Sequence, residues 1–96
     1  MNDDTFILVA KALADPTRHS IVRELRRAGE MTCSQVCEGF DCSQPTISHH
    51  IKTLEAAGVV HVREDGTYRR ITLNETLLED FARAVQGEAA GKRRKT

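Results

Sequence analysis

The sequence predicts a mainly α-helical fold with one small β-hairpin. Apolar residues recur at helical spacing in several stretches, and helix-capping residues separate these stretches. After residue 58 the pattern changes to two β-rich runs around an Asp-Gly pair, which is typical of a tight hairpin. A chain of 96 residues forms one domain with a modest core. We expect this domain to span residues 1–90 and the basic stretch 91–96 to form a disordered tail.

The first two helices are predicted over residues 4–14 and residues 16–28. Residues 4–14 carry a broad apolar surface for so small a protein, which suggests contact with another subunit. Asp15 is a favourable N-cap for the second helix, and Pro16 suits its first position. Gly29 ends this helix, because glycine adopts a left-handed cap at little steric cost.

The next two helices are predicted to form a helix-turn-helix. Thr32 and Gln35 fit a capping box at the start of a short third helix. A tight turn leads to a fourth helix within residues 43–58, capped by Ser43 or Gln44. The apolar stripe of this helix comprises Ile47, Ile51 and Leu54. Two short helices joined in this way form the motif.

A two-stranded wing is predicted from residues 59–63 and 67–73. Residues 64–66, Glu-Asp-Gly, supply the positive φ that a tight hairpin requires. Basic residues lie close to the tip, where they could clamp a phosphate backbone: Arg63, Arg69 and Arg70. With a last helix after the wing, the order ααααββα is that of a winged helix-turn-helix.

The two terminal helices predict a homodimer. The last helix begins after Asn74 and is strongly apolar, like the first. Because one small domain cannot easily bury both, we expect a two-fold dimer with recognition helices ~34–36 Å apart. The expected interface residues are Phe6, Ile7, Leu77, Leu78, Phe81 and Val85.

The polar face of the fourth helix predicts binding to double-stranded DNA. Its short donors and acceptors can reach base edges and phosphates in a major groove. The candidate DNA-binding residues of this helix and of the wing are Ser43, Gln44, Thr46, Ser48, His49, Lys52, Arg63, Arg69 and Arg70. Fourteen basic and fourteen acidic residues cancel over the chain, so we expect weak non-specific DNA binding. Site-specific contacts made by a dimer would then supply much of the affinity.

Composition excludes several other classes of protein. With 29% charged and 40% hydrophobic residues, the chain is neither a disordered acidic tail nor a membrane protein. No apolar run approaches the ~20 residues of a membrane span, and the acidic start is unlike a secretory signal, so we expect a cytoplasmic protein without a membrane partner. No phosphate-binding loop, nucleophile elbow or metalloprotease motif is present, so we expect no enzyme.

Four stretches resemble the ArsR/SmtB family of winged-helix repressors. They are residues 13–18 (Leu-Ala-Asp-Pro-Thr-Arg), 43–51 (Ser-Gln-Pro-Thr-Ile-Ser-His-His-Ile), 54–60 (Leu-Glu-Ala-Ala-Gly-Val-Val) and the wing from 63 to 70. The match covers roughly residues 8–73. This resemblance implies a homodimer, an operator with two-fold symmetry and repression that an effector relieves. It also implies that Gln44, Ser48 and His49 contact DNA.

The effector site departs from the family pattern. Where arsenic-responsive members carry Cys-Val-Cys, residues 32–34 are Thr-Cys-Ser, and residues 75–90 lack the histidines of zinc-responsive members. Cys33, Cys37 and Cys42 could still form a redox or soft-metal site, including one for a metalloid effector. The simpler interpretation is that Cys33 and Cys37 pack in the core, with no cofactor required.

Two other classes of function remain open from the sequence alone. A winged-helix domain could use its fourth helix on a protein partner, and the neutral net charge favours this alternative. The chain could also be a thiol redox or metal-handling protein. A DNA-binding repressor accounts for the most features, because it explains the polar helix, the basic wing and the apolar terminal helices together.

Overall fold

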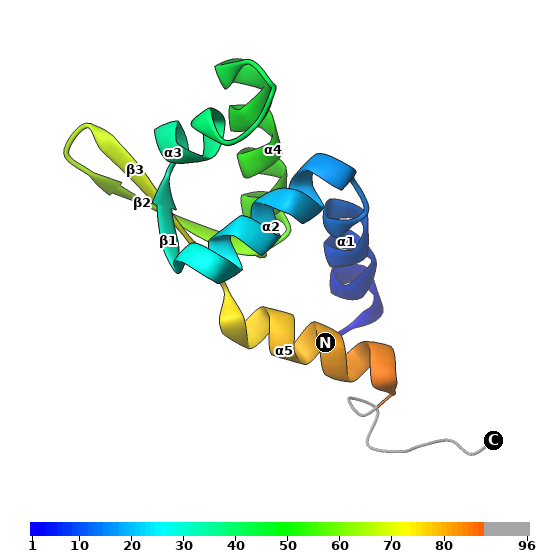
Figure 1. Ribbon diagram of the computed structural model, residues 1–96. Helices are drawn as coiled ribbons and strands as arrows, with labels where there is room; N and C mark the ends of the chain where they lie inside the picture. Colours follow the sequence, from blue (N-terminus) through cyan, green and yellow to red (C-terminus); the bar gives the residue numbers. More distant parts are fainter. Residues whose placement is uncertain (88–96) are drawn as a thin grey trace.

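The computed structural model describes residues 1–87 and confirms the mainly α-helical fold (Figure 1). The helices are α1 (Asp3–Leu13), α2 (Pro16–Ala28), α3 (Cys33–Glu38), α4 (Gln44–Ala56) and α5 (Glu75–Gln86). The strands are β1 (Glu30–Thr32), β2 (Val60–Asp65) and β3 (Tyr68–Leu73). The predicted tail, residues 91–96, lies outside the described residues. No helix within residues 1–87 is long and apolar enough to cross a membrane.

Side-chain caps fix where the helices begin, as the sequence predicts. The Asp15 carboxylate accepts a backbone N–H in the first turn of α2. Thr32 and Gln35 form the complete capping box at the start of α3. Ser43, rather than Gln44, caps α4. Because each cap satisfies donors that a helix start leaves free, it also sets which side chains of the helix face the core.

The core lies where α1, α2 and α4 meet the sheet. The largest fully buried side chains are those of Val9, Ile21, Leu25, Val36, Ile47, Ile51, Leu54, Val59, Val60 and Ile71. They include the whole predicted stripe of α4, and α2 contacts α4 through Ile21 and Leu25. Since both helices turn their apolar stripes inward, the exposed faces of α2 and α4 point away from each other.

The sheet has three antiparallel strands in the order β1-β3-β2, so the prediction of only two strands is incomplete. Strand β1 pairs with β3 beyond the hairpin, and Met31 lies opposite Ile71. A strand of three residues is too short to show an alternating pattern, and the capping signal at Thr32 overlaps it. At the hairpin tip, Gly66 has a φ of 64° and begins the two-residue loop that joins Asp65 to Tyr68.

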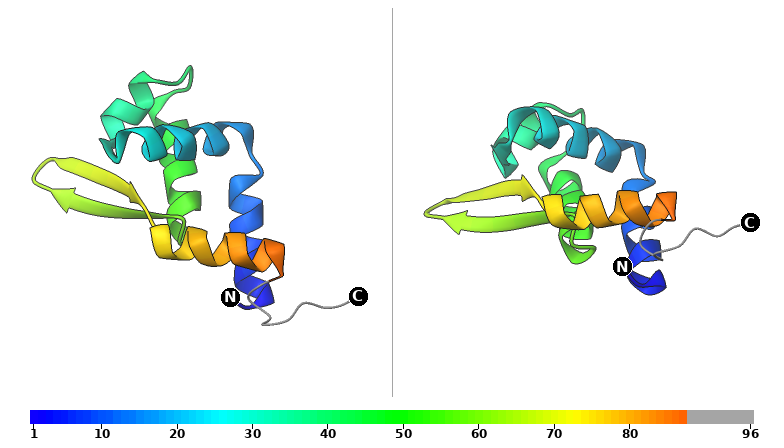
Figure 2. Two further views of the ribbon diagram at one scale, coloured as in Figure 1. Left: turned by 60° about the horizontal axis from the view of Figure 1, so that its bottom comes forward. Right: turned by 90° about the horizontal axis from the view of Figure 1, so that it is seen from below.

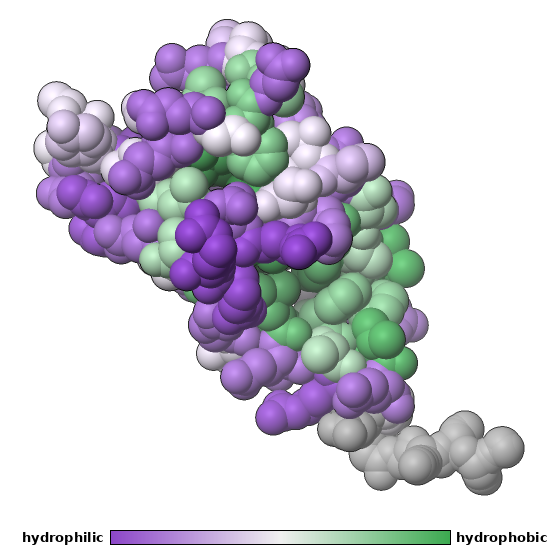
Figure 3. Space-filling model, in the orientation of Figure 1, coloured by the Kyte–Doolittle hydropathy of each residue, from purple (hydrophilic) through white to green (hydrophobic). Residues whose placement is uncertain are grey.

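Helix α5 crosses the N-terminal half of α1 at a steep angle, and the two terminal helices contact each other there (Figure 2). The rings of Phe6 and Phe81 stack with centroids 4.9 Å apart, so these two predicted interface residues contact each other within one chain. Helix α5 has no fully buried residue, and Ile7, Leu8 and Val85 are 50%, 49% and 61% exposed. Figure 3 shows hydrophobic surface gathered over α1 and α5. Within residues 1–87, no other element covers this surface.

Candidate nucleic-acid interface

The exposed face of α4 carries most of the predicted DNA contacts. Gln44, Thr46, His49 and Lys52 are exposed, and Ser48 is half-buried. The Ser43 hydroxyl accepts the backbone N–H of Thr46, and the two side-chain oxygens lie 2.9 Å apart. The capping bonds therefore hold the start of α4 rigid while its polar groups stay open to a ligand.

A cleft of about 110 Å³ separates the start of α4 from the wing. Gln44 and Ser48 line it from α4, Arg69 lines it from β3, and Cys33 lines it from α3. Among the described residues, the buried Nε of Arg69 has no hydrogen-bond partner. Because this Nε is itself shielded from solvent, a phosphate in the cleft would pair with the guanidinium through its other N–H donors. Burial raises the pKa of the Cys33 thiol, and the Arg69 charge opposes this shift.

The other two wing arginines lie on the opposite face of the sheet and are already paired. Arg63 and Arg70 stand opposite each other on β2 and β3. Glu30 lies 3.4 Å from each of them, and Asp65 lies 2.8 Å from Arg70 and 3.9 Å from Arg63. The hydrogen bond from Arg70 lowers the pKa of the Asp65 carboxyl. Two opposed like charges would otherwise weaken the hairpin.

The wing therefore does not present three equivalent arginines, as the sequence suggested. Successive residues of a strand point to opposite faces, so Arg69 and Arg70 cannot share a surface. Only Arg69 faces the cleft beside α4. Acidic partners on the outer face offset much of the charge of Arg63 and Arg70.

A contact that the sequence did not reveal anchors α4 to the rest of the fold. The guanidinium of Arg18 donates to the Ala12 carbonyl at the end of α1 (2.7 Å) and lies 3.2 Å from Nδ1 of His50 on α4. The His50 side chain is only 14% exposed. His50 thus packs and hydrogen-bonds within the fold, whereas the neighbouring His49 is exposed. The only sequence feature that pointed to Arg18 is its place in residues 13–18, one of the four stretches that resemble the ArsR/SmtB family.

The chain is similar to known transcriptional regulators. A family model described as a helix-turn-helix domain matches residues 13–63. The transcriptional repressor SdpR of Bacillus subtilis strain 168 is 40% identical over 72 residues, 75% of this chain and 79% of that protein. An arsenical resistance operon repressor of Staphylococcus aureus is 38% identical over 73 residues, 76% of this chain and 69% of the repressor.

Structure comparison agrees with the sequence relatives. The crystal structure of an ArsR family transcriptional regulator covers 98% of both chains, with a TM-score of 0.76 and 29% sequence identity. The chain belongs to the ArsR family. The resemblance predicted from four sequence stretches is thus confirmed, as is the winged helix-turn-helix fold.

The cysteines of this ArsR-family chain do not converge on one site. Cys33 lines the cleft between α4 and the wing, whereas the Cys37 thiol lies 3.9 Å from the carbonyl oxygen of Cys42 at the α3–α4 turn. All three are half-buried, including Cys42 in the turn before α4. Within residues 1–87, no group of three or more His, Cys, Asp or Glu side chains could hold a metal ion.

Proposed function

We propose that the protein is a homodimeric transcriptional repressor that binds double-stranded operator DNA in the cytoplasm and catalyses no reaction. The observation that carries this proposal is the capped α4, whose exposed polar face adjoins the cleft that Arg69 lines from the wing. Helix α4 would enter a major groove, and Arg69 would contact the phosphate beside it. The relatives named as repressors support this role.

The apolar surface of α1 and α5 supports the dimer. Ile7, Leu8 and Val85 are about half exposed or more within one chain, and a second copy of the same face would cover them. Leu77, Leu78 and Phe81 pack partly on the chain's own core. These three residues would therefore support the interface from below, while Ile7, Leu8 and Val85 contact the partner subunit directly.

A polarisation assay with the protein's own promoter region tests operator binding. We expect salt-sensitive binding that resists competitor DNA. Gln44→Ala and His49→Ala should each weaken specific binding by ~1–3 kcal/mol. Both side chains are exposed, so their variants should melt at the wild-type temperature. If both variants bind as the wild type does, α4 is not the recognition helix.

The arsenical-resistance relatives favour a thiol-reactive metalloid as the effector. Any such effector would bind Cys33 alone or the neighbouring Cys37 and Cys42, since the three thiols do not meet within the described residues. Operator release by arsenite, measured for wild type and for the triple Cys→Ser variant, tests this. Release that persists without the thiols rules out the cysteine effector and leaves the operator proposal intact.

A further inference from the structure

The outer face of α2 concentrates positive charge in a chain whose net charge is zero. Its basic side chains recur at i, i+4, i+7 and i+8: His19, Arg23, Arg26 and Arg27. They lie on the side of α2 opposite the buried Ile21 and Leu25. Figure 3 shows a strongly hydrophilic area over α2 in the middle of this face of the molecule.

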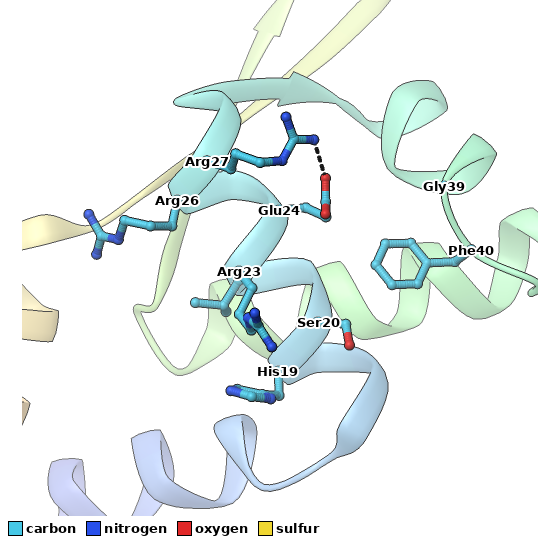
Figure 4. Close-up of a pocket in the computed structure, with 9 residues that line it drawn as sticks. His19, Ser20, Arg23, Glu24, Arg26, Arg27, Gly39 and Phe40 are labelled. Carbon is cyan, nitrogen blue, oxygen red and sulfur yellow. Dashed lines mark hydrogen bonds and ion pairs between the residues drawn. The ribbon is translucent and has the colours of Figure 1, made fainter.

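This face borders a groove of about 820 Å³ between α2 and the α3–α4 turn (Figure 4). The half-buried ring of Phe40 points from the turn toward the side of α2 that carries Ser20 and Glu24. Gly39 adds no side chain to the lining. Among the described residues, Glu24 is the only acidic one that lines the groove. The groove thus sets one aromatic ring beside the basic side chains of α2, which form its rim.

The basic groups of the rim are available to a ligand. Within residues 1–87, no side-chain hydrogen bond or ion pair engages His19 or Arg23. Arg26 pairs with Glu75 at 2.8 Å, but both side chains are more than half exposed, at 56% and 58%. Arg27 pairs with Glu24 of the same helix, and these side chains are also exposed to solvent, at 72% and 43%. Exposed ion pairs contribute only ~0–1 kcal/mol, so an incoming carboxylate can exchange for the glutamate.

The groove lies away from the surface assigned to DNA. Helices α2 and α4 pack apolar stripe against apolar stripe, so the outer face of α2 points away from His49 and Lys52. Figures 1 and 2 show α4 behind α2 when α2 is viewed from its outer side. A ligand in the groove would therefore not compete directly for the polar face of α4.

We propose that this groove binds an acidic polypeptide segment of a partner protein, which places one bulky apolar side chain against Phe40. Carboxylates beside that side chain would pair with the neighbouring arginines of α2. A single-stranded nucleic acid could also stack a base on Phe40, but the zero net charge of the chain favours a peptide, because phosphate binding depends on the sum of many positive charges. The groove has the size of typical ligand sites, roughly 300–1,000 Å³.

An NMR titration of the isotope-labelled full-length protein tests the proposal. The probe is a short capped peptide of Asp and Glu with one central Phe. Its controls carry Ser in place of Phe, or Lys and Arg in place of the acids, and a short oligothymidylate represents nucleic acid. We expect the Phe peptide to shift amide resonances of residues 19–27 and 39–40 and to bind more tightly than each control.

Two charge-reversal variants, one on the rim and one elsewhere, test the role of the rim arginines. Arg23→Glu should weaken peptide binding at least about tenfold, because it sets a like charge against the carboxylates. Arg83→Glu makes the same change in net charge on the exposed face of α5 and should alter binding less than about twofold. Arg23→Glu should keep wild-type operator affinity, so the two binding activities are tested separately.

Three results would overturn the proposal. The first is no resonance shift in α2 at millimolar peptide. The second is equal binding of the Phe and Ser peptides, which would leave only general charge attraction. The third is an oligothymidylate that shifts the groove resonances more strongly than the acidic peptide does, which would assign the face to nucleic acid.

Discussion

The three arginines of the wing differ in the acidic partners that surround them. Arg69 lines the cleft beside α4 and its Nε has no partner among the described residues, whereas Glu30 and Asp65 already pair with Arg63. We expect Arg69→Ala to weaken operator binding and to lower the slope of log affinity against log salt by about one, the effect of one lost phosphate contact. Polarisation titrations at several salt concentrations measure this slope.

Arg63→Ala is the matched control, because it removes the same charge from the other face of the hairpin. We expect a smaller change in the salt slope, since losing Arg63 also frees part of the charge of Glu30 and Asp65. Equal slopes for the two variants would contradict the assignment of Arg69 to the phosphate contact. Circular dichroism checks that each of the two variants remains folded.

Sequence could separate His49 from His50 but not Arg69 from its neighbours. The helical period of α4 is long enough to place one histidine beside the core stripe and the other on the open face. Ion pairs such as that between Arg70 and Glu30 join residues forty positions apart and depend on strand register. No local pattern encodes them, so the acidic partners of the wing appear only in the folded chain.

The junction between α4 and β2 depends on Gly58. Its φ is 84°, and a Cβ built on it would lie 2.9 Å from Cδ1 of Leu77 on α5. We expect Gly58→Ala to lower the free energy of unfolding by at least ~1–2 kcal/mol from the left-handed backbone alone, with the contact adding to this. Urea unfolding at one fixed protein concentration measures the change.

Gly39→Ala is the control at a helix end with ordinary backbone. The C-cap Gly39 has a φ of −85°, and the nearest atom to an added Cβ is the Val36 carbonyl oxygen at 3.6 Å. We expect its unfolding free energy to stay within ~0.5 kcal/mol of wild type. A Gly58 variant as stable as the Gly39 variant would contradict both the cost of the left-handed backbone and the close contact with Leu77.

Elements with local signals could be predicted, and those that depend on a distant partner could not. The caps at Asp15 and Thr32 each involve residues within one turn, so the sequence determines them directly. Strand β1 forms only because β3, some forty residues later, lies beside it. The groove beside α2 likewise needs Phe40 from another element, so the spacing of the arginines along α2 alone does not reveal it.

At the scale of the whole molecule, charge and apolar surface are separated over different elements. The polar face of α4 and the basic face of α2 point in different directions, and the apolar surface lies over α1 and α5. The sequence predicted the apolar terminal helices because amphipathic periodicity is local. It did not predict that Phe6 and Phe81 would stack within the chain, leaving Ile7, Leu8 and Val85 as the uncovered part.

Ile7→Glu should separate the dimer without unfolding the chain. The side chain is 50% exposed within one chain, so a charge there costs little in the monomer but faces its own copy in a two-fold interface. Sedimentation should show monomers, and operator affinity should fall by roughly 10²–10⁴, because two linked half-sites become two independent binding events. Thr76→Glu adds the same charge at an exposed position in the first turn of α5 and should remain a dimer. An Ile7→Glu protein that sediments as a dimer and keeps its operator affinity would place the interface elsewhere.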